Sequence, residues 1–138
     1  MKVIATWKHG KIYTAENEHK NSVTFDTSGT HGEGPTPMEV VLMGLCGCTA
    51  VDVRNILEKK RQPFTSLTVS ATAEQAATPP QVFTQITLTY RVTGDVEKKA
   101  IEDAVKLSKE KYCSVSAMLS KSAKIDFVIE HQKDETAL

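Results

Sequence analysis

Apolar and polar residues alternate with a period of two in several short segments of this chain, and this alternation is typical of half-buried β-strands. The clearest case is Ile86, Leu88, Tyr90 and Val92, which are separated by polar side chains. Segments rich in glycine, proline and small polar residues lie between these stretches and supply the turns. The predicted strands are residues 2–7, 11–15, 22–26, 67–73, 85–92 and 125–129.

The pattern changes at Pro37, after which apolar residues occupy almost every position for about four helical turns. Such a run predicts a helix that is buried on all sides rather than one that lies on a surface. Thr36 is the expected N-cap, and Glu39 places a carboxylate in the first turn. Cationic residues close the helix and Pro63 prevents its continuation. We therefore expect a helix over residues 37–60.

Gly44 and Gly47 lie inside this predicted helix, where glycine is costly. Two explanations are open: tight packing against another segment of the same domain, or packing of the helix against its own copy in a dimer. A single chain of 138 residues has little surface with which to cover a helix that is apolar on all sides. Two copies that cover each other's helix would solve this problem.

Two more helices are predicted after the strand at 85–92. Apolar positions at helical spacing form one stripe through residues 96–112, and Gly94-Asp95 is the expected cap. A short helix over 114–121 follows.

The order of elements is strands, buried helix, strands, two helices and a last strand, and it carries no glycine-rich phosphate loop. This order predicts an α+β fold with antiparallel sheets around the long buried helix. We expect one domain over residues 1–138, with a loose tail from Gln132 to Leu138.

Composition and charge limit the classes of function that we expect for this chain. The 17 basic and 17 acidic residues balance to zero net charge, which gives no support for binding nucleic acid or an anionic membrane surface. The first residues alternate like a strand and lack the apolar core of a signal peptide. The apolar stretch from Val40 to Val53 is expected to be too short and too rich in glycine to span a bilayer. We therefore expect a cytoplasmic protein that does not enter a membrane.

The three cysteines do not form a metal-binding or disulfide framework. Cys46 and Cys48 are two residues apart on the predicted helix, so their side chains point roughly 200° apart. The four histidines are scattered and form no ligand motif, so no metal is expected. Cys113 lies where one predicted helix ends and the next begins, and the positive end of a helix favours a thiolate.

Cys48 and Cys113 suit a reaction in which one thiol is oxidised and the other resolves it. The alternative is that each is a small buried apolar residue, a common role for a free cysteine. Cys46 has no assigned role beyond packing.

Two segments carry a resemblance to a known family. Pro37 is followed by Cys48 eleven residues later, and Cys113-Ser114-Val115-Ser116 is similar to a Cys-Pro-x-Ser stretch. At this spacing and in this element order, nearly the whole chain resembles the family of osmotically inducible protein C (OsmC) and the organic hydroperoxide resistance (Ohr) proteins. Within that family, residues 35–39 and 110–115 resemble the YhfA-like branch.

The resemblance implies an OsmC-like fold, an intertwined homodimer and thiol peroxidase chemistry in oxidative stress. Carried over residue by residue, Cys48 becomes the catalytic cysteine that attacks the peroxide, and Cys113 becomes the resolving cysteine. The implied substrate is a small apolar hydroperoxide. No bound cofactor is implied, since an external dithiol, commonly lipoyl, reduces the disulfide.

The family's activating pair is a glutamate directly after the motif proline and an arginine from an N-terminal loop. Here Met38 follows the proline, and the loop carries no arginine. The candidate activating residues are therefore Glu39, Lys8 and His31. The alternative function is a non-enzymatic OsmC-like dimer that binds a small apolar molecule at its interface.

Overall fold

The computed structural model describes residues 1–133, and by its internal contacts the chain divides into two compact units. The first unit is Met1–Met43 and the second begins at Gly44. The single domain expected over the whole chain stays a prediction. Most of the predicted loose tail, from 134 on, lies outside the described residues, whereas Gln132 ends a strand.

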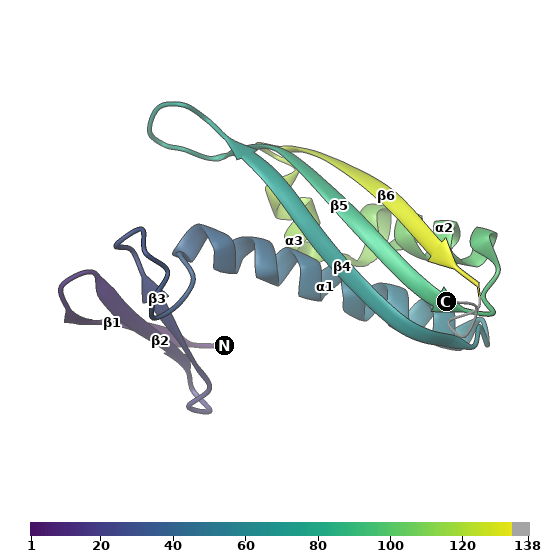
Figure 1. Cartoon of the computed structure of the whole chain (residues 1–138), viewed down its shortest axis with the longest axis horizontal. Coiled ribbons are helices and arrows are strands. Elements are labelled where there is room, and N and C mark those ends of the chain that lie inside the picture. Colours follow the sequence, from purple (N-terminus) through teal and green to yellow (C-terminus); the bar gives the residue numbers. More distant parts are fainter. Residues whose placement is uncertain (134–138) are drawn as a thin grey trace. The chain divides into compact units, whose positions relative to one another are not determined.

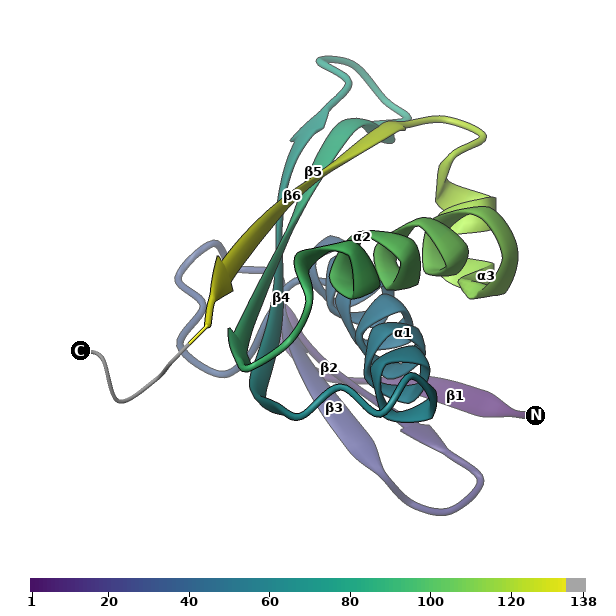
Figure 2. The same ribbon diagram turned by 90° about the vertical axis from the view of Figure 1, so that its right-hand side faces the viewer.

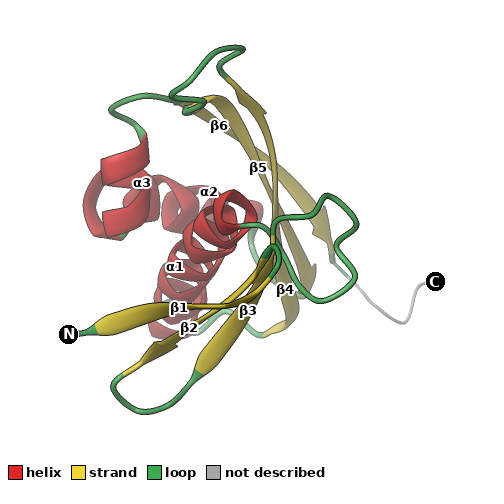
Figure 3. Ribbon diagram, turned by 90° about the vertical axis from the view of Figure 1, so that its left-hand side faces the viewer, coloured by secondary structure: helices red, strands yellow, loops and turns green. Residues whose placement is uncertain are grey.

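The first unit contains a three-stranded antiparallel sheet in which each strand pairs with the next along the chain (Figure 3). All three strands were predicted from the alternation. Few residues of this sheet are buried within the described chain. Ile12 and Asp26 are the buried ones, and every residue of the first strand is exposed. The strands are β1 (Val3–His9), β2 (Ile12–Asn17) and β3 (Ser22–Asp26).

A loop held by Asp26 leads from β3 to the long helix. Its carboxylate accepts hydrogen bonds from the backbone N–H and hydroxyl of Ser28, at 2.9 and 2.6 Å, and from the N–H of Glu33 at 3.1 Å. The hydroxyl of Ser28 is the main cause that lowers the pKa of Asp26. Gly34 is required in the loop, because a Cβ there would collide with the carbonyl oxygen of Thr24.

The long helix α1 (Pro37–Lys59) has Thr36 as its N-cap, as the sequence predicted, and the structure adds a reciprocal bond from Glu39 that makes a capping box. The Thr36 hydroxyl accepts from the N–H of Glu39 at 3.2 Å, and Glu39 Oε1 accepts from the N–H of Thr36 at 2.8 Å. At its end, the N–H groups of Gln62 and Arg61 bond back to Leu57 and Glu58, with Arg61 at φ 55°. This is a Schellman arrangement, which satisfies the last carbonyl groups.

The second unit packs helices against one face of a sheet (Figures 1 and 2). Alternate residues of the central strand, Ile86, Leu88, Tyr90 and Val92, are buried. Most of the stripe predicted over 96–112 is buried as well, whereas Leu107 is 37% exposed. This unit contains α1 from Gly44 on, β4 (Phe64–Gln75), β5 (Phe83–Gly94), α2 (Lys98–Leu107), the π-helical turn η1 (Ser108–Tyr112), α3 (Ser114–Leu119) and β6 (Lys124–Gln132).

The α+β class is confirmed, but the expectation that all sheets are antiparallel is wrong for one pair. β4 and β5 form the expected antiparallel hairpin, whereas β5 and β6 are parallel, with Ile86 opposite Ile125. The chain between these two strands contains α2, η1 and α3, which cross back over one face of the sheet. A crossover of this length delivers the next strand at the same end of the sheet, so the pairing is parallel.

The helix expected over 96–112 is interrupted. α2 ends at Leu107, and the chain continues as the π-helical turn η1, in which the N–H of Cys113 bonds to the carbonyl of Ser108 at 2.8 Å. The N-cap is Glu97, without a side-chain bond, rather than the expected Gly94-Asp95. π-Helical turns are rare and often occur at functional sites.

The expectation that α1 is buried on all sides is wrong for a single chain. One stripe, Leu45, Thr49, Val53 and Leu57, is buried at a spacing of four residues. Val41, Met43 and Val51 are 39%, 56% and 58% exposed. A Cβ added at Gly44 or Gly47 would meet nothing within 4 Å in the described part of the chain. Packing inside one chain therefore does not explain these glycines.

By length and composition, α1 is long and apolar enough to cross a membrane, so the expectation that its apolar stretch is too short is wrong. The core helix of a soluble protein meets the same two criteria, and this result is weak evidence for a membrane span. One stripe of α1 is buried, and the hydroxyl of Thr49 in that stripe is bonded to two buried side chains. That the chain does not enter a membrane stays a prediction.

Candidate active site

Two free thiols from distant parts of the chain face each other in the second unit. Cys48 lies on α1, one residue before the buried Thr49. Cys113 is the N-cap of α3, and its sulfur accepts a hydrogen bond from the N–H of Ser116 at 3.4 Å. Cys48 lies close enough to Cys113 to raise the pKa of the Cys113 thiol, and all three cysteines are free.

The two thiols differ in exposure. Cys48 is partly exposed, whereas Cys113 is 3% exposed. Burial raises the pKa of Cys113, and the neighbouring Cys48 raises it further, against a lowering by the Ser116 N–H. The expectation that the start of a helix would activate Cys113 is therefore wrong, because α3 has only six residues and desolvation outweighs its positive end.

A chain of buried hydroxyl groups lies beside the thiols, and the sequence analysis missed it. The Tyr90 hydroxyl lies 2.7 Å from Thr49 Oγ1, which lies 2.8 Å from Ser108 Oγ, and Ser108 donates to Asp52 Oδ2 at 2.9 Å. Tyr90, Thr49 and Ser108 are each at most 2% exposed. The available signal was a hydroxyl at two positions, Thr49 and Ser108, that otherwise belong to apolar helix stripes.

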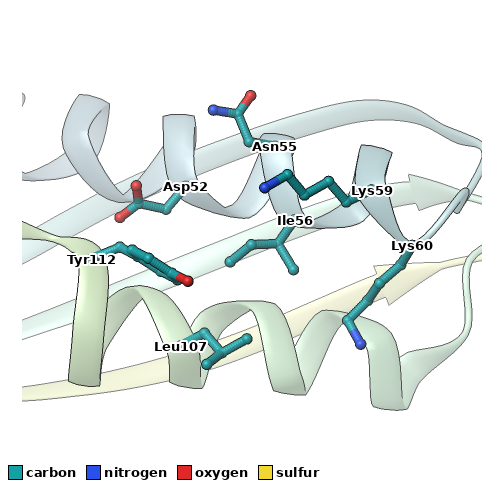
Figure 4. Close-up of a pocket in the computed structure, with 7 residues that line it drawn as sticks. All are labelled: Asp52, Asn55, Ile56, Lys59, Lys60, Leu107 and Tyr112. Atoms are coloured by element: carbon teal, nitrogen blue, oxygen red, sulfur yellow. The ribbon is translucent and has the colours of Figure 1, made fainter.

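A pocket of about 380 Å³ opens between the second half of α1 and the segment formed by α2 and η1 (Figure 4). Ile56, Leu107 and the ring of Tyr112 supply its apolar surface. Asp52 lies one helical turn beyond Cys48, and Tyr112 immediately precedes Cys113. The pocket therefore begins next to the segments that carry both thiols. The remaining lining residues are Asn55, Lys59 and Lys60.

The candidate activating residues belong to the first unit. His31 Nε2 lies 3.2 Å from Glu39 Oε1, the same oxygen that accepts from the Thr36 N–H. The backbone bond from Thr36 is the largest cause that lowers the pKa of Glu39, and His31 adds to it. Lys8 lies on β1 and is exposed. The structure thus brings together Glu39 and His31, and separately Cys48 and Cys113.

Cys46, the extra cysteine, is partly buried, and burial raises the pKa of its thiol. Across residues 1–133, no three His, Cys, Asp or Glu side chains are grouped closely enough to hold a metal ion.

The family model described as OsmC-like protein matches residues 30–128. The chain belongs to the OsmC-like family. Protein YhfA of Escherichia coli strain K12 is 40% identical to it over 127 residues, which cover 91% of this chain and 93% of YhfA. The resemblance inferred from the two motifs is confirmed, and both thiols lie inside the matched region.

Solved structures share this OsmC-like fold. The OsmC-like protein from Mycoplasma pneumoniae has a TM-score of 0.85 at 17% identity, covering 95% of this chain and 96% of its own. The organic hydroperoxide resistance protein OsmC from Legionella pneumophila has a TM-score of 0.71 at 17% identity, covering 94% and 97%. At these identities the likeness shows the fold alone.

Proposed function

We propose that this OsmC-like chain is a thiol-dependent peroxidase that reduces organic hydroperoxides. The observation that carries the proposal is the contact between the free thiols of Cys48 and Cys113. A cysteine that only fills space has no need of a second thiol as its neighbour. The name of the Legionella relative, an organic hydroperoxide resistance protein, supports the same reaction class.

The difference in exposure supports the division of roles. Cys48 is the more accessible thiol, so a peroxide reaches it first. The buried Cys113 reacts only afterwards, with the oxidised sulfur of Cys48. Burial also keeps the pKa of Cys113 raised, so that this thiol stays protonated and unreactive until a sulfenic acid forms beside it.

The reaction proceeds in three balanced steps. The Cys48 thiolate attacks one peroxide oxygen, the O–O bond breaks, and the other oxygen leaves as an alcohol after taking a proton; Cys48 becomes a sulfenic acid. The Cys113 sulfur then attacks the Cys48 sulfur, the S–O bond breaks, and water leaves. An external dithiol exchanges with the disulfide and restores both thiols.

The pocket next to the segments that carry the thiols supports an organic rather than an inorganic peroxide. Its volume of about 380 Å³ lies in the range of small-molecule sites, and Ile56, Leu107 and Tyr112 offer apolar surface to an organic group. A substrate whose organic part lies here would hold its peroxide group toward the turn of α1 that carries Cys48.

We also propose that the chain forms a homodimer and acts in the cytoplasm. The exposed apolar residues of α1 and β1 support a second copy as the partner, as do Gly44 and Gly47, where an added Cβ would meet nothing within 4 Å in the described chain. No nucleic acid or membrane partner is proposed, in keeping with the balanced charge.

The test is consumption of cumene hydroperoxide with dithiothreitol as the reductant. The unmodified chain should consume it faster than dithiothreitol alone. Cys48→Ser should abolish the activity. In Cys113→Ser, Cys48 should be oxidised once, but later turnovers should be slow. Cys46→Ser is the matched control, because it removes a partly buried thiol two residues from Cys48 and should change the rate by less than about twofold. Equal consumption with and without the chain would exclude the peroxidase.

The same pocket favours a second candidate, the non-enzymatic binding of a small apolar molecule. This function would need Ile56 and Leu107 but neither thiol. A fluorescent apolar probe should then bind Cys48→Ser as tightly as the unmodified chain, and Leu107→Asp should weaken its binding. This result together with absent peroxidase activity would favour the second candidate.

A further inference from the structure

The buried chain of hydroxyl groups has a fixed direction. The Ser108 hydroxyl donates its only proton to Asp52 Oδ2, so its oxygen must accept from Thr49. Thr49 has then used its own proton and must accept from Tyr90. Burial raises the pKa of Tyr90 to about 12, so its hydroxyl is a donor at neutral pH. Each of the three hydroxyl protons therefore has one acceptor, and hydrogen-bond donation runs from Tyr90 through Thr49 and Ser108 to Asp52.

Ser108 links the two segments that carry the thiols. Its hydroxyl is held by Thr49, which follows Cys48, and by Asp52, one turn further along α1. Its carbonyl accepts the N–H of Cys113 at 2.8 Å, the bond that closes the π-helical turn. The backbone of Cys113 is therefore attached through Ser108 to the turn of α1 that carries Cys48.

This attachment matters for the second step of the proposed reaction. A disulfide forms only when the two Cβ atoms are about 3.5–4.5 Å apart and suitably oriented. Cys113 directly follows the π-helical turn, so its position depends on how that turn is held against α1. Ser108, the first residue of the turn, is fully buried and bonded to two residues of α1, which fixes the place of the turn.

We propose that Ser108 is a positioning residue, which holds the turn that carries Cys113 in the register that lets its sulfur attack Cys48. This inference rests on the proposed function. In the step concerned, the S–S bond forms, the S–O bond of the Cys48 sulfenic acid breaks, and the hydroxyl leaves as water with the proton of the Cys113 thiol.

The first experiment separates the two steps. After one equivalent of cumene hydroperoxide, trapping with dimedone measures the Cys48 sulfenic acid, and mass spectrometry measures the disulfide. In Ser108→Ala, oxidation of Cys48 should stay within about twofold of the unmodified chain, while disulfide closure should slow about tenfold or more. Dimedone adducts and higher oxidation of Cys48 should therefore accumulate.

Two further variants distinguish positioning from a general loss of stability. Tyr90→Phe removes a bond of the same buried chain but leaves the bonds of Ser108 in place, so it should lower the melting temperature without slowing closure. Asp52→Asn keeps an acceptor for Ser108 and should close the disulfide normally, whereas Asp52→Ala should slow it. Closure by Ser108→Ala at the parent rate, or equal slowing of both steps, would overturn the inference.

A second measurement does not depend on peroxide. Equilibration in glutathione buffers gives the effective concentration of Cys48 and Cys113 toward each other, which Ser108→Ala should lower about tenfold. If the unmodified chain forms no sulfenic acid, the peroxidase proposal fails, and this measurement still tests the positioning. An unchanged effective concentration in Ser108→Ala would exclude it.

Discussion

At the residue scale, burial decides the chemistry of the candidate resolving thiol. Cys113 caps α3 and accepts from the N–H of Ser116, two features that favour a thiolate. Its 3% exposure and the neighbouring Cys48 act in the opposite direction, and the pKa of Cys113 is raised as a result. Cys113 is therefore a protonated thiol at neutral pH, and its reaction depends on losing that proton.

We predict that disulfide closure is strongly pH-dependent. Below the raised pKa of Cys113, each added pH unit increases its thiolate fraction about tenfold, so closure should accelerate about tenfold per unit between about pH 7 and 9. The measurement is stopped-flow mixing with one equivalent of hydroperoxide and detection of free thiols over time. Cys46→Ser should show the same profile, and a closure rate that is flat over this range would contradict the prediction.

Glu39 has a structural task that limits its part in activation. Its Oε1 accepts from the N–H of Thr36 and faces His31, so this carboxylate is already paired at the start of α1. Met38 stands where the resemblance implies a glutamate, and no arginine is present in the N-terminal loop. The activity of the unmodified chain is accordingly expected to be low.

We predict that Met38→Glu and Lys8→Arg together raise the rate of Cys48 oxidation by about tenfold, and by more than the product of the single effects. Arginine stabilises a thiolate, and a glutamate orients its guanidinium through paired hydrogen bonds. The measurement is stopped-flow oxidation by cumene hydroperoxide. Met38→Gln with Lys8→Arg is the matched control, since it lacks the charge that would orient the arginine. Rapid oxidation of the unmodified chain would show that another group activates Cys48.

At the element scale, the boundaries of α1 are set by hydrogen bonds at its two ends rather than by the burial of its middle. The capping box of Thr36 and Glu39 satisfies the first N–H groups, and the Schellman arrangement after Lys59 satisfies the last carbonyl groups. Between these ends, only one stripe of the helix is buried in the described chain. Its boundaries therefore depend on local hydrogen bonds that sequence alone specifies.

We predict that Thr36→Ala lowers the free energy of unfolding by about 1 kcal/mol, because the N–H of Glu39 loses its acceptor. Urea denaturation followed by circular dichroism measures this change. Glu39→Gln keeps the side-chain acceptor of the box and should cost less than Thr36→Ala. Equal stability of Thr36→Ala and the unmodified chain would show that the cap contributes nothing.

At the scale of the whole molecule, two apolar surfaces have no partner within the described chain. Val3, Ile4 and Trp7 on β1 are 71%, 54% and 64% exposed. On α1, Met43 and Val51 are exposed, and a Cβ added at Gly44 or Gly47 would meet nothing within 4 Å in the described chain. Large exposed apolar patches mark interaction surfaces. A second copy of the chain is the partner that we propose for them.

We predict that Gly47→Leu destabilises the protein by about 1–3 kcal/mol, since a leucine would overpack an interface between two copies. The direction of the stability change distinguishes a dimer from a monomer, because replacing glycine on an exposed helix of a monomer should instead stabilise the protein by up to about 1 kcal/mol. Thermal unfolding and sedimentation velocity measure both effects. Lys106→Leu, at an exposed position of α2, is the control and should not change the sedimentation coefficient. A monomer that is stabilised by Gly47→Leu would exclude the dimer.

The sequence by itself determined the elements whose signals are local. The strands at the N-terminus, the long helix from Pro37 and its cap at Thr36 all follow from alternation, apolar periodicity and capping chemistry within a few residues. The motifs around Cys48 and Cys113 also identified the OsmC-like family. Each of these signals is complete within one short stretch of chain or in the spacing of two.

Tertiary structure alone decided what depends on residues far apart in the sequence. The parallel pairing of β5 with β6 depends on the path of the intervening helices, and the buried face of α1 depends on what packs against it. The contact of the two thiols and the bonds of Ser108 to Thr49 and Asp52 join segments more than fifty residues apart. Periodicity describes one segment at a time, and a hydrogen bond between segments exists only after the core has brought them together.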